Sequence, residues 1–245
     1  MIIGKILKVL LLLLAGVYIV FKGIAFEIEG DATSALAMLL LTLLYGIWTP
    51  RKNIYFLWFL ILHTAGLIVG YFSWYGPDLY VGDTDYFYYT SNSLFILSYF
   101  VITLKFLRQL DFKSVFSQLS GPIFILIVLD IFCVSLVTAT AVSTLNIYEY
   151  TLEYVYNGII MVFLSVTLIN YMYRNDTKSM MLLIGSISVV FSEIIQLTYY
   201  YVLQNNILVF VYSFLLVIAF IFLYKQSQIQ FTGPEPEYTE EQLGA

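Results

Sequence analysis

Charged residues are scarce in this sequence. Asp, Glu, Lys and Arg make up only 11% of its 245 residues, whereas hydrophobic residues make up 61% and the mean hydropathy is +0.88. Soluble domains contain roughly 25% charged residues, so an ordinary soluble domain is excluded. The lack of a basic patch excludes a nucleic-acid partner. The single cysteine, Cys133, excludes an internal disulfide, and the single histidine, His63, excludes paired histidine ligands.

Sequence motifs for nucleotide, metal or redox chemistry are also missing. The chain contains no Walker loop, no GxSxG elbow, no HExxH and no CxxC. The alternating ten-residue segments of a membrane β-barrel are missing too. We therefore expect no cofactor and no metal site.

Long apolar runs recur from one end of the chain to the other, each long enough to cross a hydrocarbon core of roughly 30 Å as a helix. The sequence predicts an all-α, polytopic membrane protein with eight transmembrane helices. The predicted spans are 5–25, 32–49, 54–75, 86–107, 120–144, 153–173, 179–203 and 206–224.

The basic residues alternate with these spans. All of them except Lys22 lie at the amino terminus, in an even-numbered connection or after the last span. The odd connections contain no Lys or Arg, and the first three of them contain acids. The positive-inside rule then places both termini in the cytoplasm. Lys22 is expected to snorkel from the outer end of the first span.

Two regions follow from the composition. Residues 1–225 form the eight-helix transmembrane domain, and residues 226–245 form a polar, acidic cytoplasmic tail that contains Glu235, Glu237, Glu240 and Glu241. The tail is either a disordered, solvated end or a segment that contacts a protein partner. Membrane lipids are the other expected partners.

Three ionisable residues lie near the middle of spans: His63, Asp130 and Glu193. Such residues are costly in a membrane and are functional candidates by default. Apolar surroundings favour the neutral form of a carboxyl group, so we interpret Glu193 as a protonated acid and hydrogen-bond donor.

Helical spacing groups these residues with others. Ser186, Glu193, Gln196 and Tyr200 share one face of the seventh span, and His63, Gly66 and Gly70 share one face of the third. Gly66 and Gly70 form a small-xxx-small pattern that allows close helix packing. A polar centre built from spans three, five and seven is one interpretation. The other is that these residues only form hydrogen bonds that hold the bundle together.

Three stretches carry a resemblance to a known family. They are "ATSALAMLLLTLLYGIWTPRKNIYFLWFLILHTAGLIVGYF", "TSNSLFILSYFVITLKFL" and "YNGIIMVFLSVTLINYMYRNDTKSMMLLIGSISVVFSEIIQLTYYY". The order of elements resembles the bacterial YhhN-type lysoplasmalogenase-like membrane proteins. The resemblance implies an eight-helix fold, a bacterial inner (cytoplasmic) membrane location and hydrolysis of the vinyl-ether bond of lysoplasmalogens. Ser192 and Glu193 match the Ser-Asp pair of that family, which suggests Glu193 as general acid.

The chain departs from the family at one position. The family carries a second acid in a Gly-Asp pair on its third helix, and this sequence has no acid between Asn53 and Pro77. His63 or Asp130 could take that role, or the site could be inactive. Three hypotheses follow: a non-catalytic, lipid-contacting or accessory subunit of a membrane assembly, which we favour; a lipid hydrolase; and a solute or proton carrier.

Overall fold

The computed structural model describes residues 2–50, 52–77, 84–142 and 144–230. Arg51 and most of the predicted acidic tail, residues 231–245, lie outside the described residues, as do positions 78–83 of the second odd-numbered connection.

Eight long apolar helices make up the described chain, and each is long and apolar enough to cross a membrane. They are α1 (Ile2–Gly23), α2 (Glu27–Leu43), α3 (Ile54–Ser73), α4 (Tyr86–Leu107), α5 (Phe112–Ala139), α6 (Ile147–Arg174), α7 (Thr177–Tyr201) and α8 (Asn206–Gln228). A short π-helix, η1 (Leu44–Trp48), continues α2. The predicted all-α fold with eight spans is confirmed.

The helices α2, α5 and α6 begin earlier than the sequence predicts. The acids before residue 32 were expected in a connection, but Glu27, Glu29 and Asp31 lie in the first turns of α2. Likewise α6 begins at Ile147, six residues before the predicted span, because Asn146 and Glu149 form a capping box. Helices α2 and α6 therefore carry carboxyl groups into the bundle that sequence analysis assigned to connections.

Helix α5 contains a kink. It begins at Phe112, eight residues before the predicted span, and Asp111 caps it by accepting a hydrogen bond from the backbone of Lys113. Leu119 has non-helical backbone angles (φ −123°, ψ 22°), three residues before Pro122. The proline ring clashes with the carbonyl four residues earlier and lacks an N–H, which explains the bend.

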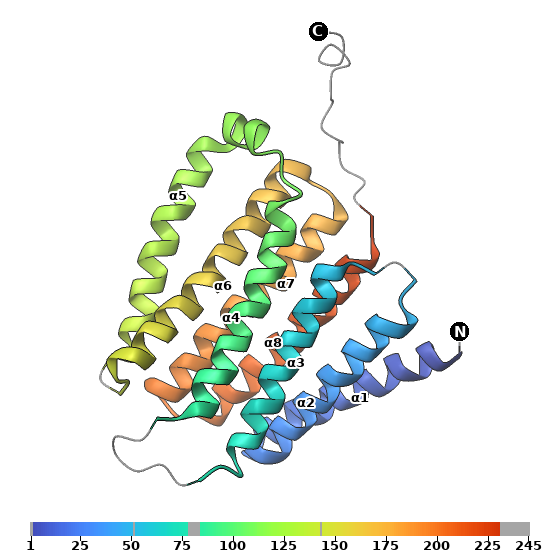
Figure 1. The fold of residues 1–245 in the computed structure, drawn as a ribbon, viewed down its shortest axis with the longest axis vertical. Helices are drawn as coiled ribbons and strands as arrows, with labels where there is room; N and C mark the ends of the chain where they lie inside the picture. The colour runs from blue at the N-terminus through green and yellow to red at the C-terminus, as the bar shows by residue number, and fades with distance from the viewer. Residues whose placement is uncertain (1, 51, 78–83, 143, 231–245) are drawn as a thin grey trace.

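Seven of the helices form a ring. In order around it, each packs on the next: α1, α2, α3, α4, α6, α7 and α8, and α8 packs back on α1. Helices that follow one another along the chain alternate in direction, so the ring neighbours α4 and α6 run parallel. Helix α5 lies at the edge of the molecule against α6 (Figure 1). We call the end at which α1, α3, α5 and α7 begin the basic end, and the opposite end the acidic end.

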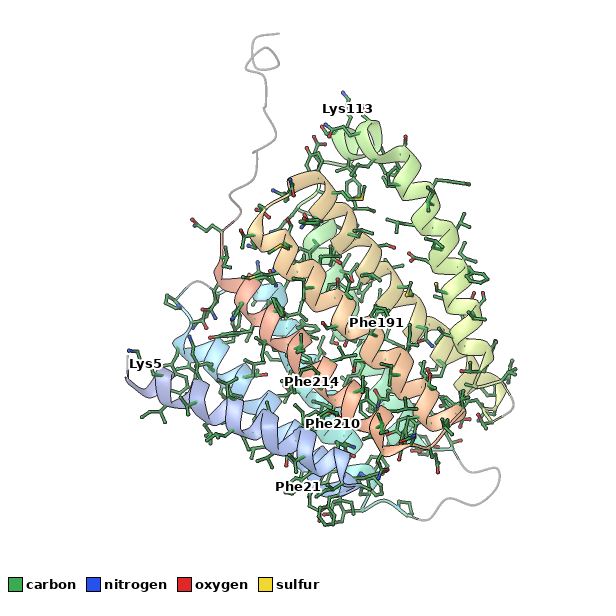
Figure 2. All side chains as sticks on the ribbon, turned by 180° about the vertical axis from the view of Figure 1, so that it is seen from behind. Lys5, Phe21, Lys113, Phe191, Phe210 and Phe214 are labelled. Carbon is green, nitrogen blue, oxygen red and sulfur yellow. The ribbon has the colours of Figure 1, made fainter. Side chains whose placement is uncertain are left out.

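Aromatic side chains fill the centre of the ring. Phe59 of α3 is fully buried, with its ring centroid 5.9 Å from that of Tyr99 in α4 and 5.9 Å from that of Phe220 in α8. The outer surface is apolar as well. Phe191 of α7 and Phe210 and Phe214 of α8 are labelled on the outward side of their helices in Figure 2, and each is about half exposed. A surface of this kind faces lipid, and the chain is an integral multi-pass membrane protein.

Lys22 does not snorkel outward. Its side chain is only 5% exposed, and its Nζ lies 2.6 Å from Asp31 Oδ1 of α2. Its methylene groups lie 3.0–3.1 Å from the position that a Cβ on Gly30 would take. The expectation was wrong because the earlier start of α2 places a carboxylate and a glycine next to this lysine.

Candidate functional site: a polar cavity in the helix bundle

A cavity of about 510 Å³ lies within the ring and extends towards the acidic end. We call it the polar cavity. It is lined by the ends of α1, α3 and α7, the beginnings of α2, α4, α6 and α8, and deeper residues of α3 and α7. Its ionisable lining residues, tyrosines aside, are Lys22, Asp31, His63, Glu153 and Glu193.

Glu193 lies on the inner face of α7 and is 8% exposed. Its carboxyl group lies close to the hydroxyl of Tyr156 on α6. The carboxyl group of Glu153, also on α6, is close enough to interact with it electrostatically. The cavity therefore holds two carboxyl groups that influence each other.

Sequence analysis missed Glu153 because it placed this residue at the boundary between a connection and the predicted span 153–173. In the structure Glu153 is 6% exposed and accepts a hydrogen bond from Tyr88 of α4 at 3.0 Å. Its other oxygen lies 3.5 Å from the side-chain nitrogen of Asn157. The available signal was the spacing of Glu153, Tyr156 and Asn157, which puts three polar groups on one helical face.

His63 of α3 also lines the cavity and is surrounded by aromatic rings. The ring centroids of Phe95 and Phe220 both lie 4.9 Å from its own. Its Nδ1 is buried and has no hydrogen-bond partner among the described residues. No hydrogen bond between His63 and Glu193 is found among the described residues either, so the two face one space without a direct bond.

The two predicted packing glycines differ in their surroundings. A Cβ on Gly66 would lie 2.6 Å from Phe95 of α4, whereas a Cβ on Gly70 would meet nothing within 4 Å. The glycine at 66 makes room for the ring that packs on His63. Gly70 lines the cavity.

The predicted polar face of α7 divides between the cavity and its neighbours. Gln196 and Tyr200 line the cavity with Glu193 and lie close to each other. Ser192 instead donates to the backbone oxygen of Tyr212 in α8 at 2.8 Å. Ser186 lies 2.6 Å from the hydroxyl of Thr167 in α6.

Asp130 of α5 lies apart from this cavity. It is half-buried, and both of its oxygens contact the hydroxyl of Ser165 in α6, at 2.9 and 2.7 Å. Of the predicted polar centre, the structure brings together the contributions of spans three and seven, and it places that of span five at the α5–α6 interface.

The mouth of the cavity carries an ion pair. Asp31, which pairs with Lys22, also accepts a hydrogen bond from the indole N–H of Trp74 at 2.9 Å. This arrangement links the ends of α1 and α3 to the beginning of α2. It presents both a positive and a negative group to whatever enters.

A second, apolar space adjoins the first. A groove of about 320 Å³ runs between α1, α2 and α8, and we call it the apolar groove. Four residues line both spaces: Tyr18, Ser34, Leu67 and Leu216. Polar and apolar compartments therefore lie side by side in the membrane-spanning region.

The lining offers hydrogen-bond donors and acceptors. Within the described ranges, no three His, Cys, Asp or Glu side chains gather in a way that could hold a metal ion. The tyrosines of the lining are Tyr18, Tyr71, Tyr88, Tyr156, Tyr200, Tyr201 and Tyr212. Their hydroxyl groups suit the recognition of a neutral or zwitterionic polar group.

Comparison of the chain with family models, with curated proteins and with solved structures gives no match. Fold and site together define the class, a polytopic eight-helix membrane protein with a polar cavity inside the bundle.

Proposed function

We propose that this protein binds a lipid-like amphiphile within the membrane, with the polar part of the ligand in the polar cavity and its hydrocarbon chain in the apolar groove. The observation that carries the proposal is the contact between the two spaces through Tyr18, Ser34, Leu67 and Leu216. Pockets that combine an apolar lining with a few converging polar groups are the usual form of small-molecule sites.

Filling the junction between the two spaces tests this proposal. Leu216→Trp adds bulk where cavity and groove meet, and Phe214→Trp on the outer face of the same helix is the matched control. We expect Leu216→Trp to weaken retention of a single-chain lysophospholipid by about tenfold, or about 1.4 kcal/mol. Native mass spectrometry of the detergent-solubilised protein measures this. Equal retention by both variants would count against the site.

The role we favour for this binding is non-catalytic, as a lipid-contacting or accessory subunit of a membrane protein assembly. The missing acid on α3 supports it, since His63 and Gly66 occupy that part of the helix. The acidic tail is the segment we propose for the protein partner. Co-purification with the full chain, and its loss with a chain that ends at residue 230 and keeps α8 intact, would support this role.

A second candidate function is favoured by the two neighbouring carboxyl groups. In the lysoplasmalogenase-like reaction, Glu193 would protonate the vinyl carbon of a lyso-ether lipid. Water would then add to the resulting cation, the hemiacetal would release an aldehyde and an alcohol, and the proton lost by water would return to Glu193. Glu153 is the second acid that α3 does not supply, and His63 faces the same space.

Release of fatty aldehyde from a lyso-vinyl-ether lipid decides between these functions. If the protein is a hydrolase, Glu193→Gln should lower turnover at least about 100-fold, the range that general acid catalysis contributes. Asp130→Asn is the matched control, because Asp130 lies at the α5–α6 interface and should leave turnover unchanged. No turnover by the folded wild-type protein would leave the non-catalytic role as the proposal.

A further inference from the structure

A third pocket lies at the basic end, away from the polar cavity. It has a volume of about 440 Å³ and is formed by the α4–α5 turn, the start of α5 and the last turn of α6. We call it the basic pocket. Its charged lining residues are Arg108, Asp111, Lys113 and Arg174.

Positive charge outweighs negative charge in this pocket, with three cations against one carboxylate. The carboxylate of Asp111 is already engaged, because it caps α5 and accepts a hydrogen bond from Ser114 at 2.6 Å. That bond holds the pKa of Asp111 below its ordinary value, so the group stays ionised and faces its own helix. The remaining charge of the pocket is positive.

More positive charge lies behind the pocket. Lys105 of α4 is 3% exposed and packs over the ring of Phe106, 4.4 Å from its centroid. It is close enough to Lys178 of α7 for mutual repulsion, and Lys178 also interacts unfavourably with Arg174. Asp176 interacts favourably with Lys178, and this effect is larger than that of Arg174.

Two arginines in the pocket are held in fixed orientations. The guanidinium of Arg108 stacks on the ring of Tyr55, with its carbon 5.5 Å from the centroid, and donates a hydrogen bond to the hydroxyl of the same tyrosine. Arg174 donates to Asn170 at 3.1 Å and to the backbone oxygen of Gln109 at 2.7 Å. A guanidinium carries five N–H donors, so Arg108 keeps donors for a further acceptor. Planar, oriented guanidinium groups suit bidentate recognition of phosphate.

The surroundings of the pocket are apolar on one side. Phe112, which lines the pocket, and Phe116, one turn further along α5, are 50% and 55% exposed. Both precede the kink at Leu119, and Figure 2 shows Lys113 at the tip of the molecule where α5 begins. Phenyl rings beside a cationic pocket at a helix end match the boundary between acyl chains and headgroups.

We propose that the basic pocket binds the phosphate group of an anionic phospholipid in the leaflet at the basic end, with Arg108 and Lys113 as its ligands and Arg174 in the pocket wall. Basic pockets between transmembrane helices are known to bind lipid headgroups. This site is separate from the polar cavity and does not depend on the function proposed for it.

The test uses the full chain in nanodiscs that contain phosphatidylcholine with or without phosphatidylglycerol. Arg108→Gln with Lys113→Gln removes two positive charges from the pocket. Lys5→Gln with Lys52→Gln removes two exposed charges at the same end outside it. We expect at least a fivefold loss of bound phosphatidylglycerol, counted by native mass spectrometry, in the first double variant only. Equal loss in both, or loss in neither, would overturn the proposal.

Two further arms make the result specific. Lys113→Glu guards against misfolding of the double variant, because Lys113 is exposed and none of the described residues bonds its side chain. It should lower phosphatidylglycerol binding at an unchanged melting temperature. If inorganic phosphate displaces the lipid at millimolar concentration, the pocket also accepts the phosphate group from a soluble compound. If it does not displace the lipid, the acyl chains are part of what is recognised.

Discussion

At the scale of single residues, the cavity depends on side chains that occupy space left by glycine. The ring of Phe95 lies over Gly66 and packs on His63. The absence of a side chain at Gly66 therefore allows Phe95 to reach the histidine. Gly30 has the same relation to the methylene groups of Lys22. Both glycines serve close approach between helices.

The two glycines of α3 give a matched prediction. Gly66→Ala places a Cβ 2.6 Å from Phe95 and should destabilise the protein by about 1–3 kcal/mol through overpacking. Gly70→Ala meets nothing within 4 Å and should leave stability unchanged or slightly raised. Thermal unfolding in one detergent measures both. Equal melting temperatures of the two variants would contradict the prediction, because the ring of Phe95 would then move aside without loss of stability.

At the scale of helices, α5 is held less firmly than the others, because it lies outside the ring and packs on α6. The strongest polar contact of that interface is the one between Asp130 and Ser165. A carboxyl group on a lipid-facing helix is costly unless it keeps such a partner.

Removal of this partner should loosen α5. We expect Ser165→Ala to destabilise the protein by about 1–3 kcal/mol, because no other hydrogen bond to Asp130 is present among the described residues. Ser135→Ala is the control at the same interface, where the hydroxyl lies 3.3 Å from that of Tyr154, and it should change stability by about 0.5 kcal/mol or less. Hydrogen exchange of the α5 backbone locates the effect. Unchanged hydrogen exchange of α5 in Ser165→Ala would refute the prediction that this contact holds the helix in place.

The helices themselves could be predicted from the sequence, because length and apolar content decide which segments span a membrane. The beginnings of α2 and α6 could not. Acidic residues near a helix start belong equally well to a connection or to a first turn, and only the capping of α6 by Asn146 and the pairing of Asp31 with Lys22 resolve this.

Only part of the candidate site could be predicted from the sequence. Glu193 and His63 stood out because they interrupt apolar runs, and both line the cavity. Glu153 did not stand out, since its helix was expected to begin there. The position of α5 outside the ring depends on which helix faces fit together, which a single sequence does not encode in its periodicity.

At the scale of the whole molecule, the basic and acidic ends define an orientation that can be tested. The positive-inside rule predicts that the basic end and both termini face the cytoplasm. In a Cys133→Ser background, Gln204→Cys lies between α7 and α8 at the acidic end, and Lys113→Cys lies at the basic end. A membrane-impermeant maleimide should label only the first in intact cells. The reverse pattern would invert the topology.

Closure of the ring through α1 and α8 has a consequence for biogenesis. Chains are made from the amino terminus, so α1 and α2, with the Lys22–Asp31 pair, enter the membrane while the helix that will cover them is still untranslated. The polar cavity is complete only when α8 arrives with Tyr212 and Leu216. A nascent chain stalled before residue 206 would therefore leave the polar cavity without the wall that α8 supplies.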